Sequence, residues 1–271
     1  MFYNIIFVKL FICIMINSYI CNAFGNLTTP LITKQRQMIL KNNIDTNEVI
    51  AQIQQLWNQL TDNQARMIEE TLCIRQFKKG EFIYRGLCSP EHIMYLVEGK
   101  VKVFKDGIGG RNQIIRVVKP TEFFGYRAHF AQEDYKTSAM SFEPCIVAFI
   151  PTSVIDNLIQ ENPCVNIFFI RQLSKELGAS NARIVNLTQK HIRGRLAEAL
   201  LYLKDTYGVE EDGNTLSIHL SREDLANLSN MTTSNAIRTL SCFAAENLIA
   251  IEGKKIKFIK EDELQKISAI G

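Results

Sequence analysis

Near the C-terminal end of the chain, a group of small polar side chains and one arginine has the chemistry to contact a nucleic acid. The group consists of Thr232, Thr233, Ser234, Asn235 and Arg238. Hydroxyl and backbone N–H groups donate to phosphate oxygens, and a guanidinium can make a bidentate contact to guanine or a contact to phosphate. A basic group follows at Lys254, Lys255 and Lys257. We expect Thr233, Ser234 and Arg238 to contact bases. Thr232 and the lysines would contact phosphates.

These side chains need a helix to present them, and residues 220–249 predict two helices joined by a turn. Ser221 is a good N-cap for the first helix, and Asp224 can bond back to it. Asn230 can take the left-handed conformation in the turn, and Thr232 caps the second helix. The predicted buried face of the second helix is Ala236, Ile237, Leu240, Phe243 and Ala244. This arrangement describes a helix-turn-helix.

The flanking segments extend this unit. Residues 249–259 alternate apolar and polar side chains around Gly253, which predicts a hairpin that carries the lysines as a basic wing. Residues 215–220 predict a strand, and residues 191–207 predict a helix. Two short helices and a hairpin are equally consistent with a small α+β core that binds no DNA, and periodicity alone does not separate the two interpretations.

The composition narrows the function classes. The 271 residues, 46% of them hydrophobic, suit a globular protein of two domains, and a net charge of only +3 requires any DNA-binding charge to be local. The seven cysteines, an odd number with no C-x-x-C spacing, are Cys13, Cys21, Cys73, Cys88, Cys145, Cys164 and Cys242. This pattern argues against a disulfide framework or a zinc site. The chain has no nucleophile motif, glycine-rich phosphate loop or useful carboxylate pair, so we expect no enzyme and no metal.

Residues 1–24 form an apolar run that is typical of a signal peptide or a short membrane anchor. Either would conflict with DNA binding. Three explanations are open. Translation starts at Met38, so that the run is absent from the protein; the run is an uncleaved anchor on a cytoplasmic regulator; or the helix-turn-helix interpretation is wrong. Residues 25–45 predict a flexible linker.

The region 46–151 has the pattern of a small sensor domain. Residues 46–60 predict an amphipathic helix, and Thr61 with Gln64 predicts a capping box at the next one. From Cys73 to Ile150, short alternating runs are separated by glycines, which predicts a β-roll, similar to a double-stranded β-helix or jelly roll.

Residues 152–190 predict a helical connector, with a long helix from Pro163 to Lys190. Its heptad stripe is Ile170, Leu173, Leu177, Ser180, Ile184 and Leu187. Such a stripe favours a parallel dimer, although it could instead pack on the roll. Residues 191–271 form the predicted C-terminal domain, so the expected fold class is α+β.

Two segments resemble the CRP/FNR superfamily of transcriptional regulators. Residues 220–259 are similar to its winged helix-turn-helix, and YLVEGKVKVF at 95–104 with EFFG at 122–125 is similar to its cyclic-nucleotide-binding roll. The resemblance implies a homodimer that binds a pseudo-palindromic operator in double-stranded DNA, with a small effector in the roll and possible contact with RNA polymerase.

The chain departs from the family pattern in the ligand pocket. Tyr126 stands where nucleotide-binding members have a glutamate for the ribose, and Lys136 and Thr137 stand near the position of their phosphate-binding arginine. We therefore do not expect a cyclic nucleotide, nor the iron–sulfur cluster of the oxygen-sensing branch. Residues that could line a pocket for another small anion, or simply be turn and surface residues, are Gly125, Tyr126, Arg127, His129, Lys136 and Thr137.

These patterns predict a cytoplasmic DNA-binding regulator with an unidentified effector. The alternative is a membrane-anchored or exported ligand-binding protein that uses the same roll without binding DNA.

Overall fold

The computed structural model describes residues 45–57, 60–107 and 112–270. The apolar run at 1–24, Met38 and almost all of the linker lie outside the described residues. Among the residues that are described, no helix combines the length and the apolar character needed to cross a membrane.

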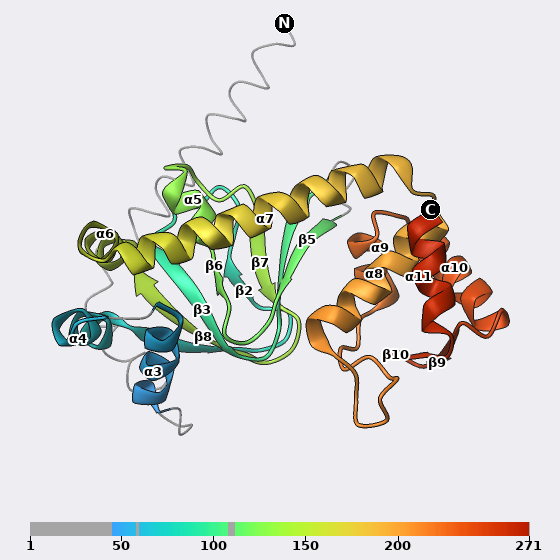
Figure 1. The fold of residues 1–271 in the computed structure, drawn as a ribbon, viewed down its shortest axis with the longest axis horizontal. Coiled ribbons are helices and arrows are strands. Elements are labelled where there is room, and N and C mark those ends of the chain that lie inside the picture. Colours follow the sequence, from blue (N-terminus) through green and yellow to red (C-terminus); the bar gives the residue numbers. More distant parts are fainter. Residues whose placement is uncertain (1–44, 58–59, 108–111, 271) are drawn as a thin grey trace, which may run out of the picture. The chain divides into compact units, whose positions relative to one another are not determined.

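The N-terminal half of the described chain is a β-roll of two four-stranded sheets, with strand orders β1-β8-β3-β6 and β2-β7-β4-β5 (Figure 1). The strands are β1 (Cys73–Phe77), β2 (Phe82–Tyr84), β3 (His92–Glu98), β4 (Val101–Asp106), β5 (Asn112–Val118), β6 (Phe123–Phe124), β7 (Ser138–Ser141) and β8 (Cys145–Pro151). The alternating runs predicted these strands, because every second side chain points into the core between the sheets. Leu96, Val103 and Val147 contribute to that core.

Four helices pack around the roll: α3 (Thr46–Trp57), α4 (Asp62–Thr71), α5 (Tyr126–Phe130) and α6 (Thr152–Glu161). The predicted capping box at the start of α4 is confirmed, since Thr61 accepts from the Gln64 N–H and Gln64 accepts from the Thr61 N–H. The ring of Trp57 stacks on Phe123 with 5.0 Å between centroids, and Phe169 of the long helix lies 6.0 Å away. This aromatic cluster fixes the start of the long helix against the roll.

The long helix, α7 (Pro163–Gln189), agrees with its prediction, and the Asn162 side chain caps it by accepting from the N–H of Cys164. The helix runs from the aromatic cluster past β5 (Figure 1). There the guanidinium of Arg183 donates to the backbone carbonyls of Ile114 and Ile115. Because β5 is the end strand of its sheet, Arg183 bonds α7 to the backbone of an edge strand.

The C-terminal unit contains α8 (Ile192–Tyr207), α9 (Arg222–Leu228), α10 (Thr233–Ala245), β9 (Ile249–Glu252), β10 (Lys255–Phe258) and α11 (Glu261–Ile270). The hairpin is confirmed, with β9 and β10 paired antiparallel. The strand predicted at 215–220 is wrong: Thr215 and Leu216 form only isolated bridges. The Asp212 carboxylate takes the N–H of Thr215, which removes a donor that a ladder would need.

The unit packs against the roll through α9. Lys102 of β4 pairs with Asp224 at 2.7 Å, and Gln113 of β5 donates to the carbonyl of Asn227 at 2.8 Å. Apolar side chains of the two regions, among them Ile114, belong to one continuous core. Thus β5 contacts both the long helix and the first helix of the helix-turn-helix.

Candidate functional site

The turn between α9 and α10 has the expected geometry. Asn230 adopts a positive φ of 51°, as predicted, and the Thr232 hydroxyl accepts from the N–H of Asn235 at 3.2 Å. Ser221 caps α9 by accepting from the N–H of Asp224. Asp224 bonds back to Ser221 as predicted, but its carboxylate accepts from the Ser221 hydroxyl rather than from the backbone N–H of a capping box, and it also accepts from Lys102. The two caps set where each helix begins, and so which side chains α10 exposes.

The outer face of α10 carries the predicted polar residues. Thr233, Ser234, Arg238 and Ser241 are exposed. Ile237 was predicted on the buried face, but 47% of it is exposed. Ala236, Leu240 and Phe243 fill the inward direction. Ile237 points about 100° away from Ala236, because an α-helix turns by that angle per residue.

One residue of the predicted set has a role that sequence reasoning missed. The side-chain oxygen of Asn235 accepts a hydrogen bond from Nη2 of Arg238 at 3.0 Å. Their spacing of three residues was the available signal, since side chains three apart on a helix are neighbours. Asn235 therefore holds the guanidinium that could contact a base.

The wing lysines differ in how they are held. Lys255 pairs with Glu210 at 2.9 Å, and Lys257 pairs with Asp212 at 3.1 Å, while Lys254 has no ion pair within the described ranges. The hydrogen bond to Glu210 raises the pKa of Lys255. Hydrogen bonds from the N–H and hydroxyl of Thr215 hold the pKa of Asp212 well below its usual range. Glu210 and Asp212 therefore compete with phosphate for Lys255 and Lys257, two of the three lysines that are predicted to contact it.

The wing is also tied to the helix-turn-helix. The guanidinium of Arg222, at the start of α9, donates to the carbonyl of Gly253 at 2.8 Å. Gly253 has a φ of +57° at the tip of the hairpin, where glycine is favoured. This bond fixes the hairpin tip, with Lys254 on it, relative to α9 and α10.

In the roll, Gly125 and Tyr126 begin α5. Gly125 has a φ of +83°, and a Cβ there would overlap the side chain of Met94. The buried Tyr126 hydroxyl donates to Glu176 of α7 at 2.6 Å, and Glu176 also pairs with Arg116 of β5. Glu122 pairs with Arg116 as well, at 3.0 Å. We call these four side chains, Arg116, Glu122, Tyr126 and Glu176, the α7 cluster.

Burial and charge act in the same direction on the pKa of Tyr126 and in opposite directions on the pKa of Arg116. Burial raises the pKa of Tyr126, and the neighbouring Glu176 carboxylate raises it further. Burial alone would lower the pKa of Arg116, but Glu176 and Glu122 raise it above its usual value. The cluster therefore joins a neutral phenol, one cation and two carboxylates, and it satisfies its own hydrogen bonds without a ligand. Sequence reasoning singled out only Tyr126 of the four.

The other predicted effector residues lie elsewhere. Arg127 and Lys136 both pair with Glu133, while the Thr137 hydroxyl lies 3.4 Å from that of Tyr84. Within the described ranges, none of these three residues is joined to the α7 cluster by a hydrogen bond or an ion pair.

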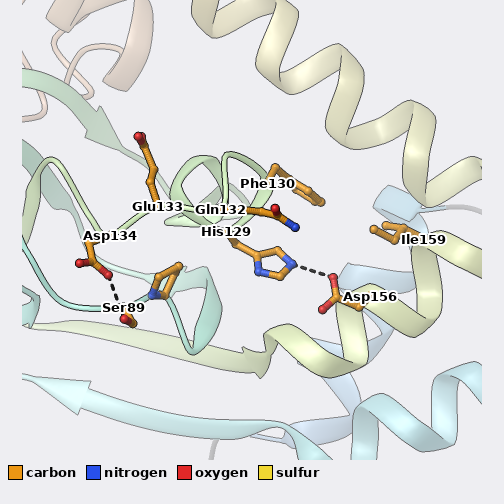
Figure 2. Close-up of a pocket in the computed structure, with 9 residues that line it drawn as sticks. Ser89, His129, Phe130, Gln132, Glu133, Asp134, Asp156 and Ile159 are labelled. Carbon is orange, nitrogen blue, oxygen red and sulfur yellow. Dashed lines mark hydrogen bonds and ion pairs between the residues drawn. The ribbon is translucent and has the colours of Figure 1, made fainter.

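His129 lines an open pocket of about 760 Å³ between α5 and α6, where it bonds to Asp156 at 2.8 Å (Figure 2). The pocket residues are Ser89, Pro90, His129, Phe130, Gln132, Glu133, Asp134, Asp156 and Ile159. Three of them are carboxylates, and one of these accepts from Ser89 (Figure 2). A small anion would meet repulsion there, so this pocket does not suit the predicted ligand class. In the part of the chain that is described, no cluster of side chains suits a metal ion.

The outer face of α7 is apolar and open. Ile170, Leu177 and Ile184 are 56%, 63% and 58% exposed. Leu173 and Leu187 are half-buried, and Ser180 is exposed. A Cβ at Gly178 would meet nothing within 4 Å, so the protomer itself does not require a glycine there.

Two families account for most of the described chain. Residues 74–162 match the cyclic nucleotide-binding domain family, and residues 194–267 match the Crp-like helix-turn-helix domain family. A CRP-like cAMP-activated global transcriptional regulator of Mycobacterium tuberculosis is 23% identical over 189 residues, which are 69% of this chain and 84% of that protein. The transcriptional activator protein Anr of Pseudomonas protegens is 25% identical over 191 residues, 70% of this chain and 78% of that one.

Solved structures agree on the fold. FixK2 from Bradyrhizobium japonicum superposes with a TM-score of 0.67 at 20% identity, covering 74% of this chain and 99% of that one. A regulator described as of the Crp/Fnr family, from Eubacterium rectale, gives 0.65 at 18% identity and covers 79% and 97%. The chain thus shares with these solved structures a fold of roll, long helix and winged helix-turn-helix.

Proposed function

Because the chain belongs to the CRP/FNR family of transcriptional regulators, we propose that it acts as a homodimer that binds a pseudo-palindromic operator in double-stranded DNA. The observation that carries this is the outer face of α10. Its side chains are exposed, they begin at a capped N-terminus, and Arg238 is held among them by Asn235. A helix of this kind fits the major groove with its first turn toward the base edges.

The outer face of α7 supports the dimer. Ile170, Leu177 and Ile184 repeat at seven residues and are exposed in one protomer, as the seam of a parallel coiled coil would be. Gly178 leaves room for a second helix to approach closely. A two-fold axis along this seam would set the two α10 helices on half-sites about 34 Å apart.

Regulation by a small effector fits the α7 cluster. A ligand that enters between the roll and α7 must replace the bonds of Glu176 with Arg116 and Tyr126. It shifts the equilibrium between the bonded and the opened arrangement of the cluster only by the difference in its affinity for the two. The carboxylate of Glu176 would repel a cyclic phosphate, so we propose that the effector is not a cyclic nucleotide. Through β5, movement of α7 would reach α9, which β5 contacts at Asn227.

The corresponding division is a sensor domain at 46–151, a connector at 152–190 and a DNA-binding domain at 191–271. The end of α7 at Gln189 and the start of α8 at Ile192 support the last boundary. A cytoplasmic location and contact with RNA polymerase follow from the proposed role as predictions.

The test is selection of duplexes from a random DNA pool by the full chain at two salt concentrations. We expect an inverted repeat to be enriched, with affinity that falls steeply as salt rises because phosphate contacts release counterions. Arg238→Ala should cost about 1–3 kcal/mol for each half-site and relax specificity at one base pair in each. Equal weakening on all sequences would make Arg238 a phosphate contact. If neither the chain alone nor the chain with added cell extract enriches any sequence, the proposed function is wrong.

A further inference from the structure

The outer face of α10 carries one large aliphatic side chain. Ile237 is 47% exposed, and its exposed neighbours one turn before and after it, Ser234 and Ser241, are small and polar. The inward direction of the helix is already filled by Ala236, Leu240 and Phe243. Packing within the protomer therefore does not account for an isoleucine at this position.

Ile237 cannot hydrogen-bond to a phosphate or to a base edge, which limits what it can recognise on DNA. The apolar group that base pairs present in the major groove is the 5-methyl of thymine. We propose that Ile237 reads the methyl group of a thymine in each half-site, beside the base contacted by Arg238. This inference rests on the proposed function and names a specificity determinant within it.

The position of Ile237 on α10 supports the pairing of the two contacts. Ile237 and Arg238 are consecutive, so their side chains leave the helix about 100° apart on its exposed side. Asn235 fixes the guanidinium of Arg238 by accepting from it at 3.0 Å. A guanidinium held at one angle and a branched, stiff aliphatic side chain next to it favour one particular pair of bases. In the expected half-site, a thymine lies in the base pair adjacent to the guanine or in the one after it.

The experiment removes the methyl group without changing any hydrogen bond. The operator selected from the random pool is synthesised with each thymine of one half-site replaced in turn by deoxyuridine. For the wild-type chain we expect one replacement to weaken binding about fourfold, the loss for one buried methyl-sized group. Ile237→Ala removes the contact from both protomers, so it should weaken binding to the thymine duplex about sixteenfold, the square of that factor. It should bind the thymine and deoxyuridine duplexes equally well.

A matched control separates this contact from a general effect of removing surface isoleucine. Ile259 is 50% exposed and lies after β10, outside α10, so Ile259→Ala should leave both affinities unchanged. Thermal unfolding of both variants checks that they fold. If no single deoxyuridine weakens binding, or if Ile237→Ala still distinguishes thymine from deoxyuridine, the inference is overturned while the proposed function stands. If no duplex is enriched at all, the proposed function fails first and the inference falls with it.

Discussion

The helices α7 and α10 each have an inner face that is fully engaged and an outer face that is open, but the two outer faces differ in chemistry. On α7, Glu176 is bonded inward to Arg116 and Tyr126, while the next residue, Leu177, is 63% exposed. On α10, Ala236 is buried, and the next residue, Ile237, is exposed among hydroxyls and a guanidinium.

This difference indicates what each outer face is suited to bind. An apolar stripe at heptad spacing complements an identical stripe, since burial of apolar area is non-directional and needs only a matching surface. A mixed face of hydroxyls, one held arginine and one aliphatic side chain complements a surface that alternates charge, hydrogen-bonding edges and methyl groups. The inner faces hold the helices in place, so changes to inner and outer faces should have separable consequences.

The largest effect is expected from a charge on the outer face of α7. Leu177→Glu places a carboxylate in the proposed seam twice, once from each protomer, where like charges repel. We expect a monomer by sedimentation and a loss of operator affinity on the order of a thousandfold, toward the level of non-specific binding. Lys175→Glu is the control, because Lys175 is exposed on α7 but outside the heptad stripe. A dimeric Leu177→Glu variant with normal affinity would move the interface away from this face.

A smaller effect is expected on the inner face. Arg116→Met leaves the carboxylates of Glu176 and Glu122 without their cation, and we expect the free energy of unfolding to fall by about 2 kcal/mol. This lies between the values for exposed and buried ion pairs, because these side chains are about a quarter to a third exposed. Fluorescence of Trp57, the sole tryptophan, reports urea unfolding. Glu122→Gln should cost less, since Arg116 keeps Glu176. Equal losses for both variants would contradict this ranking.

Much of the fold could be predicted because its signals are local. The box at Thr61 and Gln64, the left-handed Asn230 and the cap at Thr232 depend only on residues within one turn of each other. The alternating runs of the roll and the heptad stripe of α7 depend on periodicity, which a sequence shows directly.

The rest could not be predicted, because it depended on partners far apart in sequence or on a local detail that overrides a periodic pattern. Glu176 and Arg116 are separated by 60 residues, and no pattern in either segment pairs them. Ile237 lies at the edge of an apolar stripe, where a rotation of the helix by one residue decides between burial and exposure. The segment at 215–220 has a strand-like pattern, but Asp212 takes the N–H of Thr215 that a ladder would use.

The pH dependence of stability should separate the phenol of Tyr126 from the charges around it. Burial and Glu176 raise its pKa in the folded state above the unfolded value of about 10. A raised pKa means that the neutral phenol contributes its full stabilisation below about pH 10 and loses it as the pH rises toward the folded value. Tyr126→Phe should lower the free energy of unfolding by about 1 kcal/mol at neutral pH, the value of one hydrogen bond.

The difference between wild type and Tyr126→Phe should shrink when unfolding is measured above about pH 10. Tyr95→Phe is the comparison for burial without a carboxylate, because Tyr95 donates to Gln52, a neutral acceptor, and burial raises the pKa of Tyr95 to about 12. Its difference from wild type should therefore shrink between about pH 10 and 12. A difference between wild type and Tyr126→Phe that stayed constant across this range would mean that Tyr126 does not titrate as the α7 cluster requires.

The smallest effect is expected at the wing, where one hairpin carries both a side chain that is open to a partner and a side chain that is engaged within the protomer. Lys254 is without an ion pair in the described part of the chain, like the open face of α10, whereas Lys257 is engaged with Asp212, like the inner face of α7. Binding DNA through Lys257 gives up an existing ion pair, so part of the gain is cancelled. Lys254→Gln removes one phosphate contact from each protomer, so it should reduce the slope of log affinity against log salt by about 2, and Lys257→Gln should reduce it by clearly less. In an Asp212→Asn background, Lys257→Gln should then reduce the salt slope by nearly as much as Lys254→Gln does. If the two single variants change the slope equally, the ion pair with Asp212 does not restrain Lys257. Both lysines would then be as available for binding as the outer face of α10.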